Sequence, residues 1–414
     1  MLRIIPLPDA QELITRKAVR LAEAEGVVAP ILDEVRRRGD EALFEYARRF
    51  DGFTGTDVRV TATEMEAAAG QVSTEFRAAL ETAAANIAEY AQLQMPKETS
   101  FTFADGRRLG QLVRPLESMG AYIPAGRYPL PSTVLMTVIP AQVAGVKTIC
   151  VASPHPSPEI LAAAQLLKVP HVFRMGGAQA IAALAFGTVS VPKVDRIVGP
   201  GNIYVSAAKK LLAGEVGIDF VAGPTEIVII AADGDPRHLA ADMLAQAEHD
   251  VDASAILLTT SRALADKVAA EVARQLETLS TASVACESIR KNSAVIIVET
   301  LEQAADATNR LAPEHLALYD AALLPLIQHA GSVFLGPSSP EAAGDYASGP
   351  NHVLPTSGAA RIRGGLSTAD FVKVISVQEL TPAALRSIAP AVTTLARAEG
   401  LEAHARSVEV RLAE

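Results

Sequence analysis

Short apolar runs alternate with alanine-rich helical patterns along the middle of this chain, and this rhythm constrains its fold more than any other feature. Residues 148–152, 171–174 and 195–198 are predicted as strands, and residues 159–167 and 178–186 between them as helices. Strands separated by helices pair in parallel, because each connecting helix crosses one face of the sheet. The pattern therefore predicts an α/β fold with helices on both faces of a parallel sheet.

A second series of the same kind follows, so we expect two doubly wound units rather than one. Its predicted strands are residues 226–231, 255–260, 293–298 and 332–335, and its predicted helices are residues 238–249, 263–276 and 301–310. A chain of 414 residues is also too long for one ordinary hydrophobic core.

The two ends of the chain follow a different pattern. The first 110 residues carry apolar side chains at helical spacing, notably over residues 18–38, 41–50 and 76–94. A helical tail is expected from about Leu380. Helical segments are thus predicted to flank the two α/β units.

The composition excludes several classes of function. Hydrophobic residues make up 49% and charged residues 20%, which is typical of a soluble, well-packed protein. The net charge of -10 disfavours nonspecific nucleic-acid binding, and aromatic residues at 4% leave few platforms for stacked bases. We expect no signal peptide, because the N-terminus has no long apolar core and no small-residue cleavage site. We expect no membrane span, because the most apolar run, residues 134–146, is too short. The two cysteines, of which Cys150 is predicted to be a buried filler, fit a reducing cytoplasm.

Gln246 and His249 stand three residues apart in a pattern that predicts a helix through Asp250. Their side chains would leave one face of that helix, so that an amide oxygen and an imidazole nitrogen converge. Zinc accepts such N and O ligands, and Asp345 and His404 offer the other half of a site far downstream. A solvated Gln and a helix-face His are the commoner explanation of such a pair taken alone.

Glu314 and His315 form a second candidate, directly after Pro313 and next to a predicted turn or helix start. An imidazole beside a carboxylate can act as a general base, and the carboxylate can activate a water. A third candidate, the segment 344–352, is predicted as a loop that presents Asp345 and His352. An adjacent Glu-His pair and a polar surface turn also occur without any function.

Glycine-rich turns follow several predicted strands, although no G-x-G-x-x-G stands between a strand and a helix. They occur at residues 176–177, 199–202 and 223–224. Backbone amides in such turns can approach phosphates closely. Tight connections between a strand and a helix explain the same glycines without a nucleotide.

Five segments in order resemble the histidinol dehydrogenase family. They are residues 199–205 (GPGNIYV), 222–226 (AGPTE), 245–250 (AQAEHD), 309–316 (NRLAPEHL) and 344–352 (GDYASGPNH). The order and rough spacing match from about Gln111 to the C-terminus. The resemblance implies a cytoplasmic, NAD-dependent, zinc-containing enzyme that ends histidine biosynthesis. Such an enzyme oxidises L-histidinol through histidinal to L-histidine, with two hydride transfers to two NAD molecules.

The same resemblance implies a role for each matching residue. The zinc ligands would be Gln246, His249, Asp345 and His404, and the acid–base pair would be Glu314 and His315. The substrate would contact Thr225, Gln246, His249, His315, Asp345, His352, Glu399 and His404. NAD would contact Tyr122, Gln179 and Asn202. Thr225 stands where Ser is common in the family, and both residues supply a hydroxyl.

The resemblance also implies how the chain is organised. The fold would contain two incomplete Rossmann-like units, one inserted in the other, with small helical segments at both ends. The expected division is an N-terminal segment 1–21, a discontinuous unit 22–116 and 228–366, an inserted NAD-binding unit 117–227, and a helical tail 367–414. A homodimer would share its active sites, with His404 reaching the neighbouring subunit.

Two alternatives remain at this point. One is a paralogue of the same family that oxidises another small polar alcohol, such as a sulfonated diol. The presence of His352, Glu399 and His404 favours histidinol over that substrate. The other is a noncatalytic zinc-binding or nucleotide-binding protein, which the presence of Glu314 and His315 disfavours.

Overall fold

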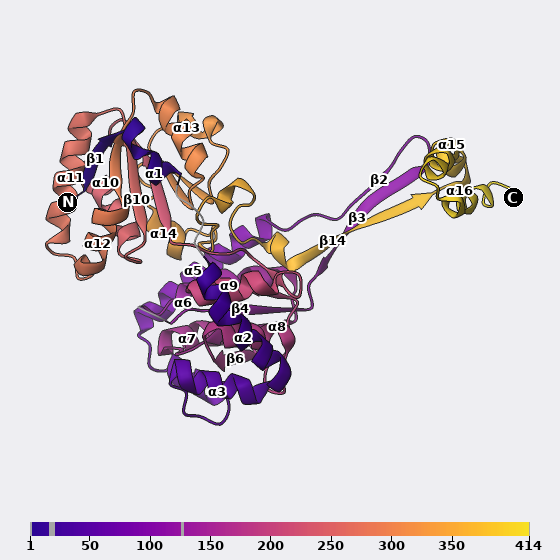
Figure 1. The fold of residues 1–414 in the computed structure, drawn as a ribbon, viewed down its shortest axis with the longest axis horizontal. Coiled ribbons are helices and arrows are strands. Elements are labelled where there is room, and N and C mark those ends of the chain that lie inside the picture. Colours follow the sequence, from indigo (N-terminus) through magenta and orange to yellow (C-terminus); the bar gives the residue numbers. More distant parts are fainter. Residues whose placement is uncertain (1, 16–20, 126–127, 414) are drawn as a thin grey trace.

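The computed structural model describes residues 2–15, 21–125 and 128–413, and it confirms an α/β fold built on parallel sheets (Figure 1). Two parallel sheets form two lobes, and a third, antiparallel sheet forms an arm that extends away from both. No helix within the described ranges is both long enough and apolar enough to cross a membrane. The expected helix start at Ala18 lies outside the described residues.

The first parallel sheet has six strands in the order β1-β11-β10-β9-β12-β13. Its strands are β1 (Arg3–Pro6), β9 (Glu226–Ile230), β10 (Ser254–Thr259), β11 (Ala294–Ile297), β12 (His315–Leu318) and β13 (Ser332–Leu335). Its helices are α10 (Pro236–Ala247), α11 (Arg262–Leu276), α12 (Ala282–Asn292) and α13 (Leu301–Leu311). A short helix near the N-terminus, α1 (Gln11–Ile14), packs against α13.

The second parallel sheet has five strands in the order β6-β5-β4-β7-β8. Its strands are β4 (Ser118–Tyr122), β5 (Thr148–Ser153), β6 (His171–Arg174), β7 (Arg196–Val198) and β8 (Gly217–Ile218). Its helices are α6 (Pro131–Ala144), α7 (Pro158–Leu166), α8 (Gly177–Phe186) and α9 (Ile203–Leu212).

Both sheets follow one topology. Counted from β4 in one sheet and from β9 in the other, the strand order is 3-2-1-4-5, which is the order of a doubly wound fold as far as it goes. The chain leaves the six-stranded sheet after β1 and returns to it only at β9. The five-stranded unit is therefore inserted into the six-stranded one.

The N-terminal helices pack on the inserted unit. They are α2 (Ala22–Arg38), α3 (Asp40–Asp51), α4 (Ala62–Ala69) and α5 (Thr74–Leu93). Helix α2 lies against α8 and α9, α3 against α8, α4 against α7, and α5 against α6. We expected residues 22–116 to share a unit with residues 228–366, but these helices pack mainly on the helices of the inserted unit, and α5 also bonds to residues 228–366 through Asn86 and the carbonyl of Ala347. This packing favours a boundary that groups residues 22–93 with the inserted unit, and the division into domains stays a prediction.

The strands of the parallel sheets are buried on both faces, which explains why the sequence predicted them. Every residue of β9 and of β10 is buried. Parallel strands covered by helices on both sides are continuous apolar runs rather than alternating ones. Cys150 in β5 is fully buried, as expected, and burial raises the pKa of its thiol to about 12.

The antiparallel arm departs from the sequence-based expectation. Its central strand β3 (Arg107–Pro115) pairs with β2 (Thr99–Thr102) and, along its whole length, with β14 (Val372–Leu380). Residues 99–110 were expected to be helical. They are strands because their partner β14 lies far away in the sequence, where no local pattern can indicate the pairing.

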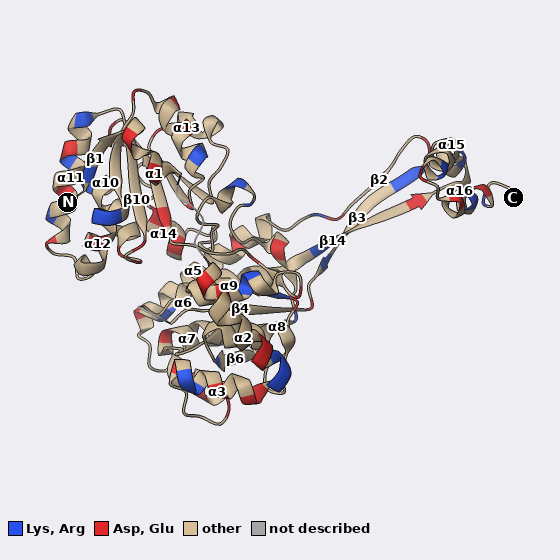
Figure 2. Cartoon of the chain, in the orientation of Figure 1, with Lys and Arg blue, Asp and Glu red and all other residues tan. Residues whose placement is uncertain are grey.

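Two helices end the arm at a distance from both lobes (Figure 1). They are α15 (Pro382–Ala398) and α16 (Glu402–Glu409), which confirm the expected helical tail. Figure 2 shows basic and acidic segments side by side where β3 and β14 meet, and there Arg108 forms an ion pair with Glu379. Apolar side chains along the arm remain exposed, namely Val374, Ile375, Val377, Leu395, Leu401 and Val410.

Candidate functional site

The amino ends of two paired strands bring the first part of the site together. β12 pairs with β9 so that His315 lies opposite Ile227, and the preceding residues of both strands become neighbours. The Thr225 hydroxyl donates to Oε2 of Glu314 at 2.5 Å, and the backbone N–H of Glu226 donates to the same oxygen at 3.0 Å. Ala312, with a φ of 54°, ends α13 and turns the chain into β12. The expected turn before Glu314 is confirmed, and a strand follows it rather than a helix.

Glu314 is poised for proton transfer. It is 6% exposed, and burial raises the pKa of its carboxyl, although His315 and the hydrogen bond from Thr225 oppose that rise. A buried carboxyl with a raised pKa can accept or hold a proton closer to neutral pH than a solvated one. Its Oε2 is occupied by two donors, which leaves Oε1 as the oxygen open to a water or substrate.

Helix α10 carries Gln246 on its last turn and ends at Ala247, so His249 lies in the turn that follows. This corrects the expectation of a helix through His249. The turn is tight, because the N–H of His249 donates to the carbonyl of Gln246 at 3.4 Å. Both side chains consequently face the same short helix, which carries Glu341 and Asp345. These two carboxylates, together with Gln246, His249 and His315, form a cluster of polar side chains.

That short helix is α14 (Glu341–Tyr346), and it presents Glu341 and Asp345 one turn apart on one face. His249 Nε2 lies 3.6 Å from Asp345 Oδ2, and candidate ligand atoms of His249, Glu341 and Asp345 all lie within 4.8 Å of one another. Asp345 was expected in a loop. The segment is helical because Gly344 lets it pack against Phe334, whose ring would lie 2.5 Å from a Cβ at that position.

Glu341 is the site residue that sequence reasoning missed. It is 3% exposed, and its spacing of four from Asp345 was the signal that could have found it. The signal was obscured because the segment was predicted as a loop, where a spacing of four carries no meaning.

The amide of Gln246 tests whether the cluster suits a cation. With its nitrogen donating to Thr225 Oγ1 at 2.7 Å, its oxygen faces the Glu341 carboxylate. The reverse orientation lets the nitrogen donate to Glu341 at 2.6 Å, but its oxygen then needs the one hydroxyl proton of Thr225, which Glu314 already accepts. The first orientation therefore leaves the oxygen of Gln246 facing the carboxylate of Glu341, and Asp345 lies beside Glu341 in the same cluster. Such a donor set fits a divalent cation.

His315 lies among the carboxylates of the cluster. Its Nδ1 is 3.3 Å from Glu341 and 3.7 Å from Glu314, and its Nε2 is 3.6 Å from Asp345. Nε2 is buried and has no hydrogen-bond partner in the described part of the chain. Burial lowers the pKa of His315, but the three carboxylates outweigh that effect and raise the pKa to about 10.

The pKa values of the two carboxylates on α14, Glu341 and Asp345, are shifted in opposite directions. Burial raises the pKa of Glu341 to about 8, with His315 opposing the rise. Burial also acts to raise the pKa of Asp345, but the neighbouring imidazoles of His249 and His315 outweigh it and hold that pKa below its usual range. The pKa of His249 is raised, because Asp345 outweighs the effect of burial. The surroundings thus favour the protonated forms of Glu341, His249 and His315 and the ionised form of Asp345.

His352 joins the cluster from the loop after α14. Its Nδ1 lies 2.7 Å from the carbonyl of Asp345, so that this nitrogen carries the proton, and its Nε2 lies 3.2 Å from the Thr133 hydroxyl of α6. Burial lowers the pKa of His352. A cavity of about 270 Å³ opens beside the cluster, lined by His249, Glu341 and Asp345 and by residues 128–132.

A second cavity, of about 440 Å³, lies at the carboxyl edge of the five-stranded sheet. Tyr122 ends β4, Gln179 lies on the first turn of α8, and Asn202 caps α9, and all three line this cleft. In open α/β sheets ligands bind at this edge, where the strand order reverses, here between β4 and β7. Residues 124–125 line the cleft and residues 128–132 line the cavity at the cluster.

Two predicted site residues lie elsewhere. Glu399 follows α15 and His404 lies on α16, and both are exposed at the far end of the arm (Figure 1). Within one chain they do not reach the cluster. Sequence reasoning placed them near the substrate through the neighbouring subunit, and that placement stays a prediction.

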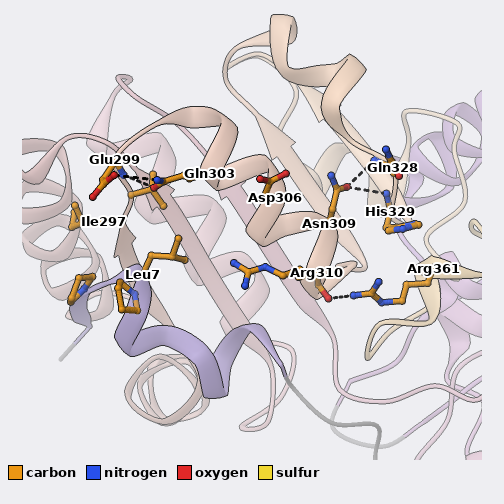
Figure 3. Close-up of a pocket in the computed structure, with 13 residues that line it drawn as sticks. Leu7, Ile297, Glu299, Gln303, Asp306, Asn309, Arg310, Gln328, His329 and Arg361 are labelled. Atoms are coloured by element: carbon orange, nitrogen blue, oxygen red, sulfur yellow. Dashed lines mark hydrogen bonds between the residues drawn. The ribbon is translucent and has the colours of Figure 1, made fainter.

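A wider cavity, of about 900 Å³, runs along α13 and shares no residue with the cluster or the cleft (Figure 3). Figure 3 shows Asn309 accepting hydrogen bonds from the backbone of Gln328 and His329, while Arg361 donates to the carbonyl of Arg310. None of the residues singled out from the sequence for catalysis or cofactor binding lines this cavity.

Comparisons with known proteins agree on one family. The histidinol dehydrogenase family model matches residues 14–412. The histidinol dehydrogenase of Gluconobacter oxydans is 48% identical over 416 residues, covering 97% of each chain, and that of Geobacter sulfurreducens is 49% identical over 401 residues, covering 94% of each. The crystal structure of histidinol dehydrogenase from Elizabethkingia anophelis matches with a TM-score of 0.94 at 39% identity, covering 99% of this chain and 98% of that one. With matches along almost its entire length, this chain belongs to the histidinol dehydrogenase family.

Proposed function

We propose that this chain oxidises L-histidinol to L-histidine through L-histidinal, with two molecules of NAD as hydride acceptors and one zinc ion at the cluster. The observation that carries the proposal is the assembly of Thr225, Glu314 and His315 against Gln246 and Asp345. A proton-transfer pair thus lies directly beside a cation-binding set.

Zinc would be held by Gln246, His249 and Asp345 together with His404 of the partner subunit. These residues supply the N and O ligands that zinc accepts, and a cation would compensate the oxygens of Gln246 and Glu341 that face each other. When bound, the metal supplies a positive charge that orients the polar groups of the substrate. Thr225, His352 and Glu399 are proposed as further substrate contacts.

The alcohol step would use His315 as the base. Its Nε2 is buried without a hydrogen-bond partner, and the hydroxyl proton would move to that nitrogen as hydride leaves the carbinol carbon. The three carboxylates around the ring favour its protonated form, and a bound dication compensates the same charges. His315 would therefore act as a neutral base only when the cation-binding set is filled.

The aldehyde step would use Glu314. Two donors hold Oε2 in place, so Oε1 is the oxygen that accepts a proton from the attacking water. Tyr122, Gln179 and Asn202 would hold NAD in the cleft, and NAD supplies the hydride acceptor when bound. Residues 124–125 line the cleft and residues 128–132 line the cavity at the cluster, which suits a cofactor whose nicotinamide must reach the cluster while its adenosine stays in the cleft.

A homodimer with exchanged arms would complete each site. The arm leaves the lobes of its own chain and carries exposed apolar residues, among them Val374, Ile375 and Leu395, that a second copy could cover. The same arm carries Glu399 and His404, which do not reach the cluster of their own chain. A cytoplasmic location is proposed with it, because Cys150 and Cys286 form no disulfide.

Two measurements test these proposals. The first is NADH formation from L-histidinol and from L-histidinal, with and without a chelator, beside the zinc content of the protein. Zinc-free protein with full activity would refute the role of the metal, and no NADH from either substrate would refute the reaction.

The second measurement mixes two inactive variants, His249→Asn and His404→Asn. If the site is shared, a mixed dimer holds one intact site, so refolded equimolar mixtures should recover about a quarter of the wild-type activity. If each chain forms its own site, every site lacks one ligand, and the mixture should stay inactive.

A further inference from the structure

Asp51 is a buried carboxylate that lines the cleft beside the proposed NAD contacts. It is the last residue of α3, is 9% exposed, and lines the cleft together with Tyr122 and Gln179. We propose that Asp51 selects the nucleotide, because its carboxylate accepts a hydrogen bond from the adenosine ribose and rejects a phosphate ester on that ribose. The inference rests on the proposed function insofar as it takes the cleft to be a dinucleotide site.

The carboxylate is fixed in place by its neighbours. Its Oδ2 accepts hydrogen bonds from the backbone N–H of Gly176 at 2.9 Å and from Nε2 of Gln179 at 3.1 Å. The approach requires glycine at position 176, because a Cβ there would lie 2.9 Å from Oδ1 of Asp51 and 2.6 Å from the Cβ of Pro154. A side chain held this firmly presents one oxygen orientation to a ligand.

The other oxygen is available to a ligand. Oδ1 of Asp51 accepts no hydrogen bond from any group that the structure describes. A carboxylate is an acceptor only, so the partner it suits is a donor such as a sugar hydroxyl. A hydrogen bond from a hydroxyl to a charged carboxylate is stronger than one between neutral groups.

The charges of the cleft point to the same choice. Among the described residues that line it, Asp51 is the one carboxylate, and there is no Lys, Arg or His. A phosphate ester adds about 1.5 to 2 negative charges, and beside Asp51 it would meet repulsion without a compensating cation. Dinucleotide sites that read a ribose 2′-hydroxyl use an acidic residue, whereas those that accept a 2′-phosphate use an arginine.

Basic residues near Asp51 belong to a different cavity. Arg59, Arg174 and His155 line a neighbouring space on which Asp51 also borders. Arg174 is bonded to Glu64 at 2.7 Å, and Arg59 lies 2.8 Å from Nδ1 of His171. These two guanidinium groups are engaged outside the cleft, and His155 lines the neighbouring space and not the cleft.

The apolar lining indicates which ribose Asp51 would meet. Val27, Ile31 and Phe50 line the cleft beside Asp51, and they offer an apolar surface to a base. Pro124 and Ala125 also line the cleft, and the next described residues of the chain, 128–132, line the cavity at the cluster. The nicotinamide belongs at the cluster, so the adenosine belongs at Phe50 and Asp51.

The test compares Asp51→Asn with the wild type in binding and in turnover. Binding of ADP-ribose and of its 2′-phosphate ester is measured by calorimetry, and KM and kcat are measured with NAD and with NADP. The wild type should bind ADP-ribose tighter than the ester by about 10- to 100-fold, as expected for a hydrogen bond to a charged group. Asp51→Asn should reduce this preference at least about tenfold, raise the KM for NAD, and leave kcat nearly unchanged.

Two further variants separate recognition from folding. Asp51→Glu keeps the charge but displaces it, so it should weaken ADP-ribose binding while still rejecting the 2′-phosphate. Asp40→Asn removes a carboxylate from the other end of α3 that accepts the backbone N–H of Ser190 at 3.1 Å, and it should leave the preference unchanged.

Three results would overturn the inference. One is a wild type that binds both ligands equally, a measurement that needs no variant to fold. Another is an Asp51→Asn protein that folds and keeps the wild-type preference. The third is a loss of preference in Asp40→Asn. The binding assay needs no substrate. Failure to oxidise histidinol would therefore refute the proposed reaction, and the nucleotide preference set by Asp51 could still be measured.

Discussion

The hydroxyl of Thr225 donates to Oε2 of Glu314 at 2.5 Å, although the two residues belong to segments far apart in the chain. The contact exists because β9 and β12 are paired neighbours and each of the two residues immediately precedes its strand. The hydrogen bond fixes Oε2 of Glu314 and leaves Oε1 free to accept a proton from a water or the substrate. The first prediction follows from this arrangement.

Glu314→Gln should slow the aldehyde-to-acid step more than the alcohol-to-aldehyde step. The aldehyde step needs a group that takes a proton from water, and a neutral amide cannot take it. We expect a loss on the order of 10² to 10⁴ with histidinal as substrate. NADH formation is followed with histidinol and histidinal supplied separately.

His315→Asn is the companion variant for that measurement. It should slow the alcohol step, alone or together with the aldehyde step, because the proton acceptor for the hydroxyl is removed. Equal losses on both substrates in Glu314→Gln would contradict the division of labour between the two residues.

His249→Asn should abolish stoichiometric zinc binding, measured as metal per chain by atomic absorption after dialysis. The variant removes an imidazole that lies 3.6 Å from Asp345 and replaces it with a shorter side chain. His238→Asn is the matched control, because His238 lies on α10, the helix that precedes His249, and is exposed. Equal zinc content in the two variants would exclude His249 as a ligand.

Glu341→Gln should weaken zinc binding by about 10- to 100-fold, as is typical for groups that support metal ligands. The variant removes the buried negative charge that faces Gln246 and His315. The zinc-free protein should be no less stable than the wild type, because a buried carboxylate without a cation is costly.

The control for that variant is Glu248→Gln, which changes another carboxyl that lines the same cavity. Glu248 accepts a hydrogen bond from Thr281 rather than from a member of the cluster. Zinc affinity is measured by competition with a chelator of known affinity. An unchanged affinity in Glu341→Gln would limit Glu341 to packing.

Asp242→Asn should raise the free energy of unfolding above pH 6. Burial raises the pKa of Asp242 in α10 from 3.8 to about 6, with His238 opposing the rise. The folded state therefore favours the protonated carboxyl, and its contribution is fully present below about pH 3.8 and lost as the pH rises through about 6. An amide avoids that loss, and we expect a gain of roughly 2 kcal/mol.

Urea unfolding at several pH values measures this effect. The gain should grow between about pH 4 and pH 6 and stay level above that range. Asp266→Asn on α11 is the control, because its carboxylate is exposed and pairs with Arg262 one turn away. A gain that does not depend on pH would show that the titration of Asp242 is not its cause.

The sequence predicted the parallel sheets well because their strands are short, apolar and separated by helices. Residues 226–231, for example, match β9 within one residue, since burial on both faces makes the run continuous. The arm was not predicted. β3 and β14 are far apart in the sequence, and their exposed faces give no apolar alternation that would indicate a strand.

The sequence predicted those site residues whose amino-acid type alone indicates a chemical role. Glu314, His315 and Asp345 carry groups that are rare in an apolar surrounding, and the structure brings them together. Glu341 escaped because its meaning depends on the helix α14, which a loop prediction conceals. Asp51 escaped because its partner is the backbone of Gly176, a contact that no spacing along the chain reveals.

The arm also determines how fast enzymatic activity develops after the chain has folded. A newly folded chain has its cleft and its cluster in place, but Glu399 and His404 stand at the end of an arm that its own lobes do not contact. Under the shared-site proposal, a working site forms only when two such chains collide and exchange arms. Recovery of activity after refolding should then be second order in chain concentration, with a lag that shortens as the protein becomes more abundant.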